Sequence, residues 1–301
     1  MREAYHIISD GSCDLSPEFA EEQNVTIVPF YVSFDEEHYE KENVDVSVRD
    51  FYQRMVDKKG VYPKSSMPSV QDYVDAFKPF AETGVPVICI CITTKFSGSM
   101  QSALNAKQMI LEDYPKAQIT VIDATVNTVL QGIYVLEAVR MRDSGAGYEE
   151  SVKRLEKIKS SGRIFFTVGD MEYLQHGGRI GKVAGVAGSL LGIRPIITLK
   201  QGEIFPSGIG RSRKKTVEKT IDLLVKYLKE DNKDISRYSF AVGYGYDYEE
   251  GVQYRDRTIE VLKENGYELT PKQLPLRQIG AAIGVHTGPY PLGLGVMEKS
   301  L

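Results

Sequence analysis

The sequence of 301 residues contains no tryptophan, only three cysteines and only four histidines. Three cysteines cannot build a disulfide framework, and no two histidines stand in HxH or HxxxH spacing, so a histidine-rich metal site is not expected. Cys89 and Cys91 alternate within an apolar run and are predicted to be small core residues of a buried strand. Cys13 has no basic neighbour to activate its thiol, which argues against a nucleophile.

Long hydrophobic runs are missing as well. Residues 1–16 contain no apolar core of a signal peptide, and the longest apolar stretches, near 85–92 and 183–199, are too short or too interrupted to span a bilayer. A net charge of −4 argues against a general nucleic-acid-binding protein. These absences predict a cytoplasmic protein with no nucleic-acid partner and no stable membrane insertion. The length leaves room for two domains of ordinary size.

Motifs for phosphate binding and serine catalysis are incomplete. The nearest approach to a phosphate-binding loop, Gly181-Lys182, is followed by Val183 and has His176 where the first glycine belongs. No GxGxxG opens a helix after the first strand, and no serine lies in a GxSxG elbow. The chain is therefore not expected to bind a nucleotide or a metal cofactor of its own.

The first half of the chain alternates between short apolar runs and amphipathic segments. Runs that are apolar throughout, such as 85–93, are typical of parallel strands covered on both faces. Strands are predicted at residues 4–9, 24–34 with a break at Pro29, 85–93 and 117–124. Helices are predicted from Pro17 onward with Ser16 as N-cap, and at 47–57, 69–82, 97–111, 128–143 and 147–160. This rhythm predicts an N-terminal parallel α/β sheet domain over residues 1–162.

The second half is patterned differently. It predicts a strand at 163–169, two short helical stretches around a glycine cluster, and a hairpin that turns at Gln201-Gly202. A helix at 212–230, a strand at 237–245, a helix at 248–265 and a short glycine-rich tail follow. A hairpin combined with helices favours a C-terminal α+β domain over residues 163–301.

Four loops combine small, polar and glycine residues at positions where α/β proteins bind ligands. They are residues 64–69, 93–99, 177–181 and 286–289. A helix that starts after Ser97 would offer free N–H groups to an anion, although Ser97 could equally be an ordinary N-cap. Arg179 lies between glycines and can approach a carboxylate closely. His286 could be a binding residue or a structural one.

These loops and three further segments resemble the DegV family, whose members include the acid-carrying subunit of bacterial fatty acid kinase. Each motif is weak by itself, but seven in the same order are specific and extend over nearly the whole chain. The matching segments are 10–15 (family pattern DSxxDL), 65–69 (TSxPS), 96–103 (LSGTxxSA), 177–180 (GGRI), 188–196 (GSLLxIKPI), 211–215 (RxRKK) and 286–289 (HxGPG).

The sequence departs from the family pattern at four places. Gly11 replaces a serine, Ser65 replaces a threonine and keeps the hydroxyl group, and Ala124 stands where the family has a serine. Tyr290 replaces the final glycine of HxGPG and is expected to add bulk near the head group of the ligand.

The resemblance implies two domains with one long-chain fatty acid buried between them and no other cofactor. It implies that Ser65, Ser97 and the N–H of Gly98 bind the carboxylate. Arg179 and His286 would form the supporting polar network, with Thr287 beside it. The small residues of 183–192 would form one wall of the acyl tunnel, although close helix packing explains the same glycines.

The resemblance also implies a non-catalytic role in which a separate fatty acid kinase phosphorylates the bound acid. A basic run, Arg211, Arg213, Lys214 and Lys215, is predicted to dock that partner or the phosphates that it holds, although a solvated helix face is the simpler interpretation. Transient contact with a membrane surface is compatible with this role. Two other hypotheses stay open: a lipid esterase or acyltransferase that uses Ser97 and His286, and a sensor of another acidic small molecule.

Overall fold

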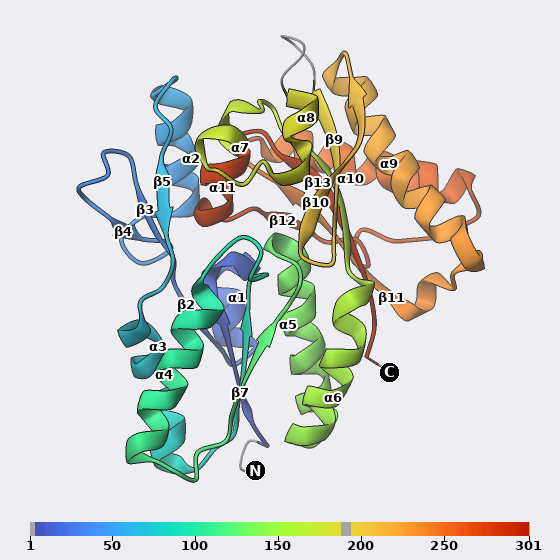
Figure 1. Ribbon diagram of the computed structural model, residues 1–301. Coiled ribbons are helices and arrows are strands. Elements are labelled where there is room, and N and C mark those ends of the chain that lie inside the picture. Colours follow the sequence, from blue (N-terminus) through green and yellow to red (C-terminus); the bar gives the residue numbers. More distant parts are fainter. Residues whose placement is uncertain (1–3, 188–193, 301) are drawn as a thin grey trace.

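The computed structural model of the protein describes residues 4–187 and 194–300 (Figure 1). The motif at 188–196 therefore lies mostly outside the described residues, as does the second half of the predicted tunnel wall at 183–192. Within the described ranges, the chain forms a parallel sheet, a mixed sheet and a small antiparallel sheet. The predicted α/β fold class, with a parallel sheet followed by a separate mixed-sheet domain, is confirmed.

The parallel sheet has the strand order β2-β1-β6-β7. Its strands are β1 His6–Asp10, β2 Val25–Val28, β6 Val87–Cys91 and β7 Ile119–Asp123. One face packs on α3 Val70–Thr83 and α4 Ser99–Asp113, and the other on α1 Pro17–Glu22, α5 Thr128–Asp143 and α6 Tyr148–Ile158. Because both faces are covered, the strands are rich in apolar residues and β6 is apolar throughout, with Cys89 and Cys91 fully buried as predicted.

Serine side chains begin several helices at the predicted positions. The hydroxyls of Ser16 and Ser47 cap α1 and α2 Val48–Asp57, and Ser69 forms a reciprocal capping box with Asp72 at the start of α3. The predicted helix at 97–111 instead begins at Ser99, with Gly98 as N-cap. The side chain of Ser97 accepts a hydrogen bond from the N–H of Ser99 and lies outside the helix.

A small antiparallel sheet of order β4-β3-β5 branches from the parallel sheet after the predicted break at Pro29. Its strands are β3 Tyr31–Ser33, β4 Glu40–Lys41 and β5 Lys64–Ser66. Strand β5 was not predicted, because three polar residues carry no apolar alternation. The sheet and α2 pack on α11 Ala281–Thr287, so a segment from the first half of the chain is buried against the second half.

The mixed sheet has the order β10-β9-β8-β13-β11-β12. Its strands are β8 Arg163–Thr167, β9 Arg194–Lys200, β10 Glu203–Gly210, β11 Tyr238–Tyr244, β12 Leu276–Gln278 and β13 Leu292–Glu298. The hairpin of β9 and β10 turns at residues 201–202 as predicted. The predicted glycine-rich tail contains α11 and the central strand β13. Gly293 and Gly295 weaken the strand signal of β13 in the sequence, because glycine is unfavourable within a strand.

The remaining elements are helical. They are α7 Glu172–His176, α8 Ala184–Ala187, α9 Arg213–Lys229, α10 Tyr248–Glu264 and the 3₁₀ turns η1 Gly11–Cys13, η2 Lys159–Ser161, η3 Gly181–Val183, η4 Glu230–Asn232 and η5 Ile235–Arg237. Among the described residues, we find no helix with both the length and the apolar character that crossing a membrane demands.

Helix α5 lies between the two large sheets and belongs to one core that they share (Figure 1). Its side chains contact the parallel sheet on one side and strands β11 and β13 on the other. Helices α9 and α10 cover the outer face of the mixed sheet. Every strand of the mixed sheet follows residue 162, and the division into domains 1–162 and 163–301 stays a prediction.

Candidate functional site

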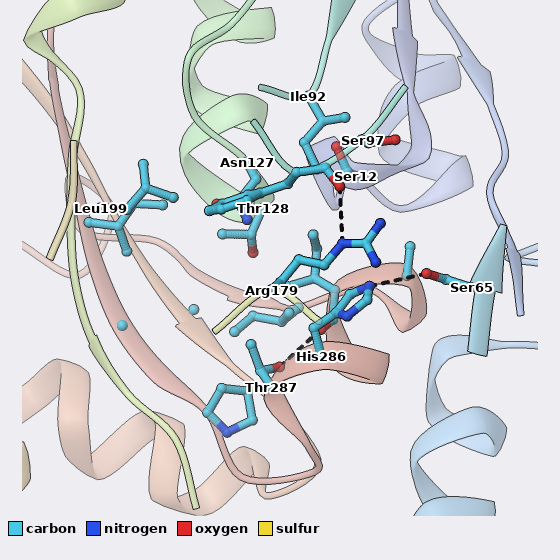
Figure 2. A pocket seen from close by; sticks show the side chains of 18 of the residues that line it. Ser12, Ser65, Ile92, Ser97, Asn127, Thr128, Arg179, Leu199, His286 and Thr287 are labelled. Carbon is cyan, nitrogen blue, oxygen red and sulfur yellow. Dashed lines mark hydrogen bonds between the residues drawn. The ribbon is translucent and has the colours of Figure 1, made fainter. Parts of the chain in front are cut away.

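A cavity of about 260 Å³ lies where the ends of the parallel strands meet the inner face of the mixed sheet (Figure 2). All six residues predicted to bind a ligand line it: Ser65, Ser97, Gly98, Arg179, His286 and Thr287. Figure 2 shows Ser65, Arg179 and His286 gathered on one side, with Leu199 of the mixed sheet on the other. The rest of the wall is largely apolar and includes Ile92, Ile164, Phe166, Leu199, Ile204 and Ile279. The cavity therefore has a polar side and a largely apolar remainder, which also contains the polar residues Ser12, Ser66, Asn127 and Thr128.

Ser65 and His286 come from β5 and α11 and form a hydrogen bond of 3.1 Å between Oγ and Nε2. Burial lowers the pKa of His286 to about 4, and the nearby charges of Arg179 and Lys64 act in the same direction. The imidazole is therefore neutral at neutral pH. When Nε2 carries the proton, it donates to Ser65 and leaves the serine hydroxyl proton for a ligand. A Cβ on Gly177 would overlap Nδ1 of His286, which explains the glycine at that position.

The loop before α4 supplies two further donors. Ser97 Oγ accepts the N–H of Ser99 at 3.1 Å, so its own proton is available. The N–H of Gly98 has no acceptor among the described residues, and the side chain of Met67 covers this glycine. A Cβ on Gly98 would lie 2.8 Å from Met67 Sδ. The loop therefore presents a hydroxyl and a backbone N–H to the same cavity.

Arg179 is exposed and anchored by the backbone at the edge of the cavity. Its Nε donates to the carbonyl of Phe96 at 3.1 Å, and Nη1 donates to that of Gly177 at 2.8 Å. These bonds fix the guanidinium between the glycine-rich loop and the loop before α4, leaving Nη2 for an anion. Thr287 donates its hydroxyl to the carbonyl of Ile283 at 3.2 Å, so it can only accept from a ligand.

A buried carboxylate below the cavity was missed as a functional residue, although it stands in the matched segment 10–15. Asp10 is fully buried at the end of β1. Its carboxylate accepts from Ser12 Oγ at 2.7 Å, Gln131 Nε2 at 2.8 Å, Ser99 Oγ at 2.8 Å and the N–H of Ile92 at 2.9 Å. Burial raises its pKa despite these bonds. Asp10 ties together the segments that hold Ser12, Ile92 and the start of α4 against the cavity.

Two further buried acids, Glu42 and Asp14, fix the start of α11. Glu42 accepts a hydrogen bond from the N–H of Ala281, and Asp14 accepts one from Thr128 Oγ1. Burial raises the pKa of Glu42 to about 7, and burial together with the charge of Glu42 raises that of Asp14 well above its usual value. Both acids face Gly280, where a Cβ would collide with each carboxylate. The helix that carries His286 is thus held by acids from the first half of the chain.

The connection from β7 to α5 is strained where it reaches the cavity. Thr125 and Thr128 have φ of 56° and 50°, a region that β-branched residues rarely adopt. Asn127 and Thr128 line the cavity beside Val129. Strain of this kind persists where the surrounding structure requires it, and functional sites are a common place for it. No sequence pattern indicated these residues.

The structure does not bring every predicted residue together. His286 bonds to Ser65 and not to Ser97, and no carboxylate bonds to its ring among the described residues. Tyr290, which was expected to add bulk near the head group, does not line the cavity. It lines a neighbouring cleft together with Tyr62, Tyr173 and Arg194. Cys13 is fully buried and its pKa is raised to about 12 by burial, which keeps the thiol protonated.

The basic run lies at the start of α9, outside the lining of the cavity. Arg213 forms a bidentate ion pair with Glu250, with distances of 2.7 and 2.8 Å. Arg211, Lys214 and Lys215 are exposed and have no ion-pair partner among the described residues. Within these residues, no group of three or more His, Cys, Asp or Glu side chains could hold a metal ion.

Comparisons with known proteins agree with the predicted family. Residues 4–299 match the family described as "Uncharacterised protein, DegV family". A DegV domain-containing protein of Clostridium acetobutylicum is 30% identical over 299 residues, which cover 99% of each chain. A crystal structure of a stearic acid-binding protein from Eubacterium ventriosum is 47% identical, with a TM-score of 0.92 over 98% of this chain and 99% of that one. The fatty acid-binding protein DegV from Bacillus subtilis is 25% identical, with a TM-score of 0.82 over 98% and 99% of the two chains.

Proposed function

The chain belongs to the DegV family, and on this basis we propose that it binds one long-chain fatty acid and presents the carboxylate to a separate ATP-dependent kinase. The chain itself would carry the acid without catalysing a reaction. In that process the bound carboxylate attacks the γ-phosphate of ATP, the bond from that phosphorus to the β–γ bridging oxygen breaks, and ADP leaves as an acyl phosphate forms.

The observation that carries this proposal is the distribution of polarity in the cavity. Its donors, Ser65, Ser97, the Gly98 N–H and Arg179, converge on one side, and the remaining wall is mostly apolar. A carboxylate moved out of water needs such donors, because its desolvation otherwise costs several kcal/mol. Each buried methylene of an acyl chain contributes about 0.8 kcal/mol in return. An amphipathic acid fits this division. The similarity to a stearic acid-binding protein supports the same conclusion.

We expect the purified protein to contain a fatty acid, and Arg179→Ala to weaken its binding about 10- to 100-fold. The reason is that a charged hydrogen bond to a carboxylate contributes about 1.5–3 kcal/mol. Native mass spectrometry followed by solvent extraction gives the mass of the ligand, and titration with stearate gives the affinity. Ser97→Ala should reduce the affinity less, because Gly98 and Ser65 remain.

Lys182→Ala is the matched control for Arg179→Ala, since Lys182 is a nearby cation that pairs with Glu203 outside the cavity. A protein that neither contains a fatty acid nor takes up stearate would contradict the proposal. Binding of a shorter or differently shaped acid instead would favour a sensor of another acidic molecule. Hydrolysis of p-nitrophenyl esters would favour the esterase hypothesis, against which the low pKa of His286 and its bond to Ser65 argue.

The proposed partner is the kinase that supplies ATP, and the proposed docking surface is the basic run at the start of α9. Cations at a helix N-terminus interact unfavourably with the helix dipole, so helix stability does not explain the position of these residues. Arg211, Lys214 and Lys215 are free to meet an acidic surface or bound phosphates, whereas Arg213 is already paired with Glu250. Complementary charge of this kind chiefly accelerates encounter.

Reversing Lys214 and Lys215 to glutamate should slow phosphorylation of the bound acid about tenfold at low salt, because it removes electrostatic attraction from the encounter. The measurement is acyl phosphate formation with the fatty acid kinase of the same organism and labelled ATP, with the acid content of the protein determined in parallel. The control is reversal of Lys153 and Lys157, two exposed lysines of α6. Equal rates for both double variants and the wild type would show that the basic run does not dock the kinase.

A further inference from the structure

Two neighbouring strands at the centre of the mixed sheet lack a side chain at the same level. Gly243 of β11 and Gly293 of β13 stand opposite each other in the antiparallel ladder, and both line the cavity. Residues paired in this way point to the same face of a sheet. The row continues on β8 with Phe166, which is paired with Gly293 and lines the cavity as well. The mixed sheet thus carries no side chain at two adjacent positions, on neighbouring strands, where it faces the cavity.

The backbone conformation does not account for this pair. No φ between +20° and +160° occurs at either position, so the backbone itself would accept alanine. A Cβ on Gly243 would meet Val129 of α5 at 3.4 Å, whereas the three atoms nearest to a Cβ on Gly293 all belong to β8. A Cβ on a third glycine of the same face, Gly295, would meet Leu130 of α5 at 3.4 Å. That glycine lies outside the cavity and permits the approach of the helix. Glycine within a strand is unfavourable without such a reason, and one common reason is the close approach of a ligand.

The groups around the pair are themselves cavity walls. A Cβ on Gly243 would lie 3.2 Å from Cδ1 of Ile279 and 3.4 Å from Cγ1 of Val129, and one on Gly293 would lie 3.0 Å from Cβ of Phe166. Ile279, Val129 and Phe166 all line the cavity. A single methyl group at either position therefore narrows the cavity between walls that are already close.

We propose that the Gly243–Gly293 pair is the part of the wall against which the acyl chain lies, and that the missing side chains determine which acyl chains fit. This inference rests on the proposed function, because it assigns an acyl chain to the cavity. The pair acts on the acyl part alone, since the donors for the carboxylate belong to other elements. Adding a methyl group should change affinity and chain preference without affecting the head-group site.

The test compares Gly243→Ala and Gly293→Ala with the matched control Gly295→Ala, which introduces the same methyl group on the same face but outside the cavity. Affinities for myristate, palmitate and stearate are measured by titration of delipidated protein, with circular dichroism to confirm folding. We expect both cavity variants to bind stearate about tenfold or more weakly than the wild type and to lose more affinity for stearate than for myristate. Gly295→Ala should bind all three acids as the wild type does.

A double variant keeps the test decisive if the first alanine disturbs the fold. Ile279→Ala removes Cδ1 and Cγ1, which would each lie 3.2 Å from the new methyl group, so Gly243→Ala combined with Ile279→Ala should recover stearate binding. Wild-type affinities in both alanine variants, beside a wild type that binds stearate, would overturn the inference and leave the proposed function intact. A wild type that binds no fatty acid would overturn both.

Discussion

We expect Asp10→Ala to lower the free energy of unfolding by about 2–4 kcal/mol, because it removes the shared acceptor of a buried hydrogen-bond network. The substitution removes an acceptor shared by the hydroxyls of Ser12 and Ser99, the amide of Gln131 and the N–H of Ile92. The first three keep a second partner, in Gln131 Oε1, Tyr73 Oη and Ser9 Oγ respectively for Ser12, Ser99 and Gln131, but the N–H of Ile92 has no other acceptor among the described residues. Each buried donor left without a partner costs about 1–3 kcal/mol. Because the N–H of Ile92 belongs to the buried backbone, it cannot turn toward another acceptor. Urea denaturation at neutral pH measures the change.

Two variants make the result specific to Asp10. Asp10→Asn preserves the shape but turns an NH₂ group toward donors, so it should fall between the wild type and the alanine variant. Asp75→Ala removes an exposed carboxylate from α3 and should change the stability by less than about 0.5 kcal/mol. If Asp10→Ala were as stable as Asp75→Ala, the network would not hold the start of α4 and the end of β6 together.

The pH dependence of stability should contain two opposed contributions. The folded-state pKa of Glu42 is raised from 4.5 to about 7, so the folded protein holds this proton more tightly and stability falls as pH rises across that interval. The folded-state pKa of His286 is lowered from 6.5 to about 4, so stability falls as pH decreases across that interval. Each contribution amounts to about 3 kcal/mol. Between about pH 4.5 and 6.5 they oppose each other, and the raised pKa values of Asp10 and Asp14 add a decline in stability as pH rises.

Single substitutions separate the two contributions. Glu42→Gln should be up to about 3 kcal/mol more stable than the wild type at pH 8 and similar to it at pH 4.5, because the cost of a buried charge disappears. Asp14, which faces the same site and has a raised pKa, remains in this variant and leaves a smaller decline with pH. His286→Gln should instead lose the decrease in stability that the wild type shows as pH falls from 6.5 to about 4. Glu37→Gln, which removes an exposed carboxylate from the connection between β3 and β4, is the control. If the free energy of unfolding of Glu42→Gln and that of the wild type changed in parallel with pH, Glu42 would not be the source of the decline at neutral pH.

Much of the fold could be predicted because local patterns and tertiary structure agree. The apolar run at 85–93 and the serine caps at 16 and 69 act within a few residues, and the structure has the strand and helices there. Strand β5 and strand β13 could not be found in this way. The first has three polar residues and the second alternates leucine or valine with glycine, so each exists because of the strands beside it.

In the candidate site, too, local motifs predict some residues, and only the tertiary structure shows others. Ser65, Ser97, Arg179 and His286 could be named because they stand in short motifs with a fixed order, and the structure places them around one cavity. The contact between Ser65 and His286 could not be predicted, since 221 positions separate the two residues. Glu42 gave no signal, because an isolated glutamate in a polar segment is normally exposed. Only the fold shows that it is buried against the start of α11.

The place of β13 in the mixed sheet also has a consequence for biosynthesis. Strand β13 pairs with β8 on one side and β11 on the other, yet it follows both in the chain. Until residues 292–298 have emerged from the ribosome, the strands β8-β9-β10 and β11-β12 form two fragments that no strand joins, and the second face of α5 lacks its contact with β13. Exposed faces of this kind are what chaperones protect during synthesis. The cavity is therefore closed by one of the last steps of folding, and a nascent chain has no enclosed place for a ligand.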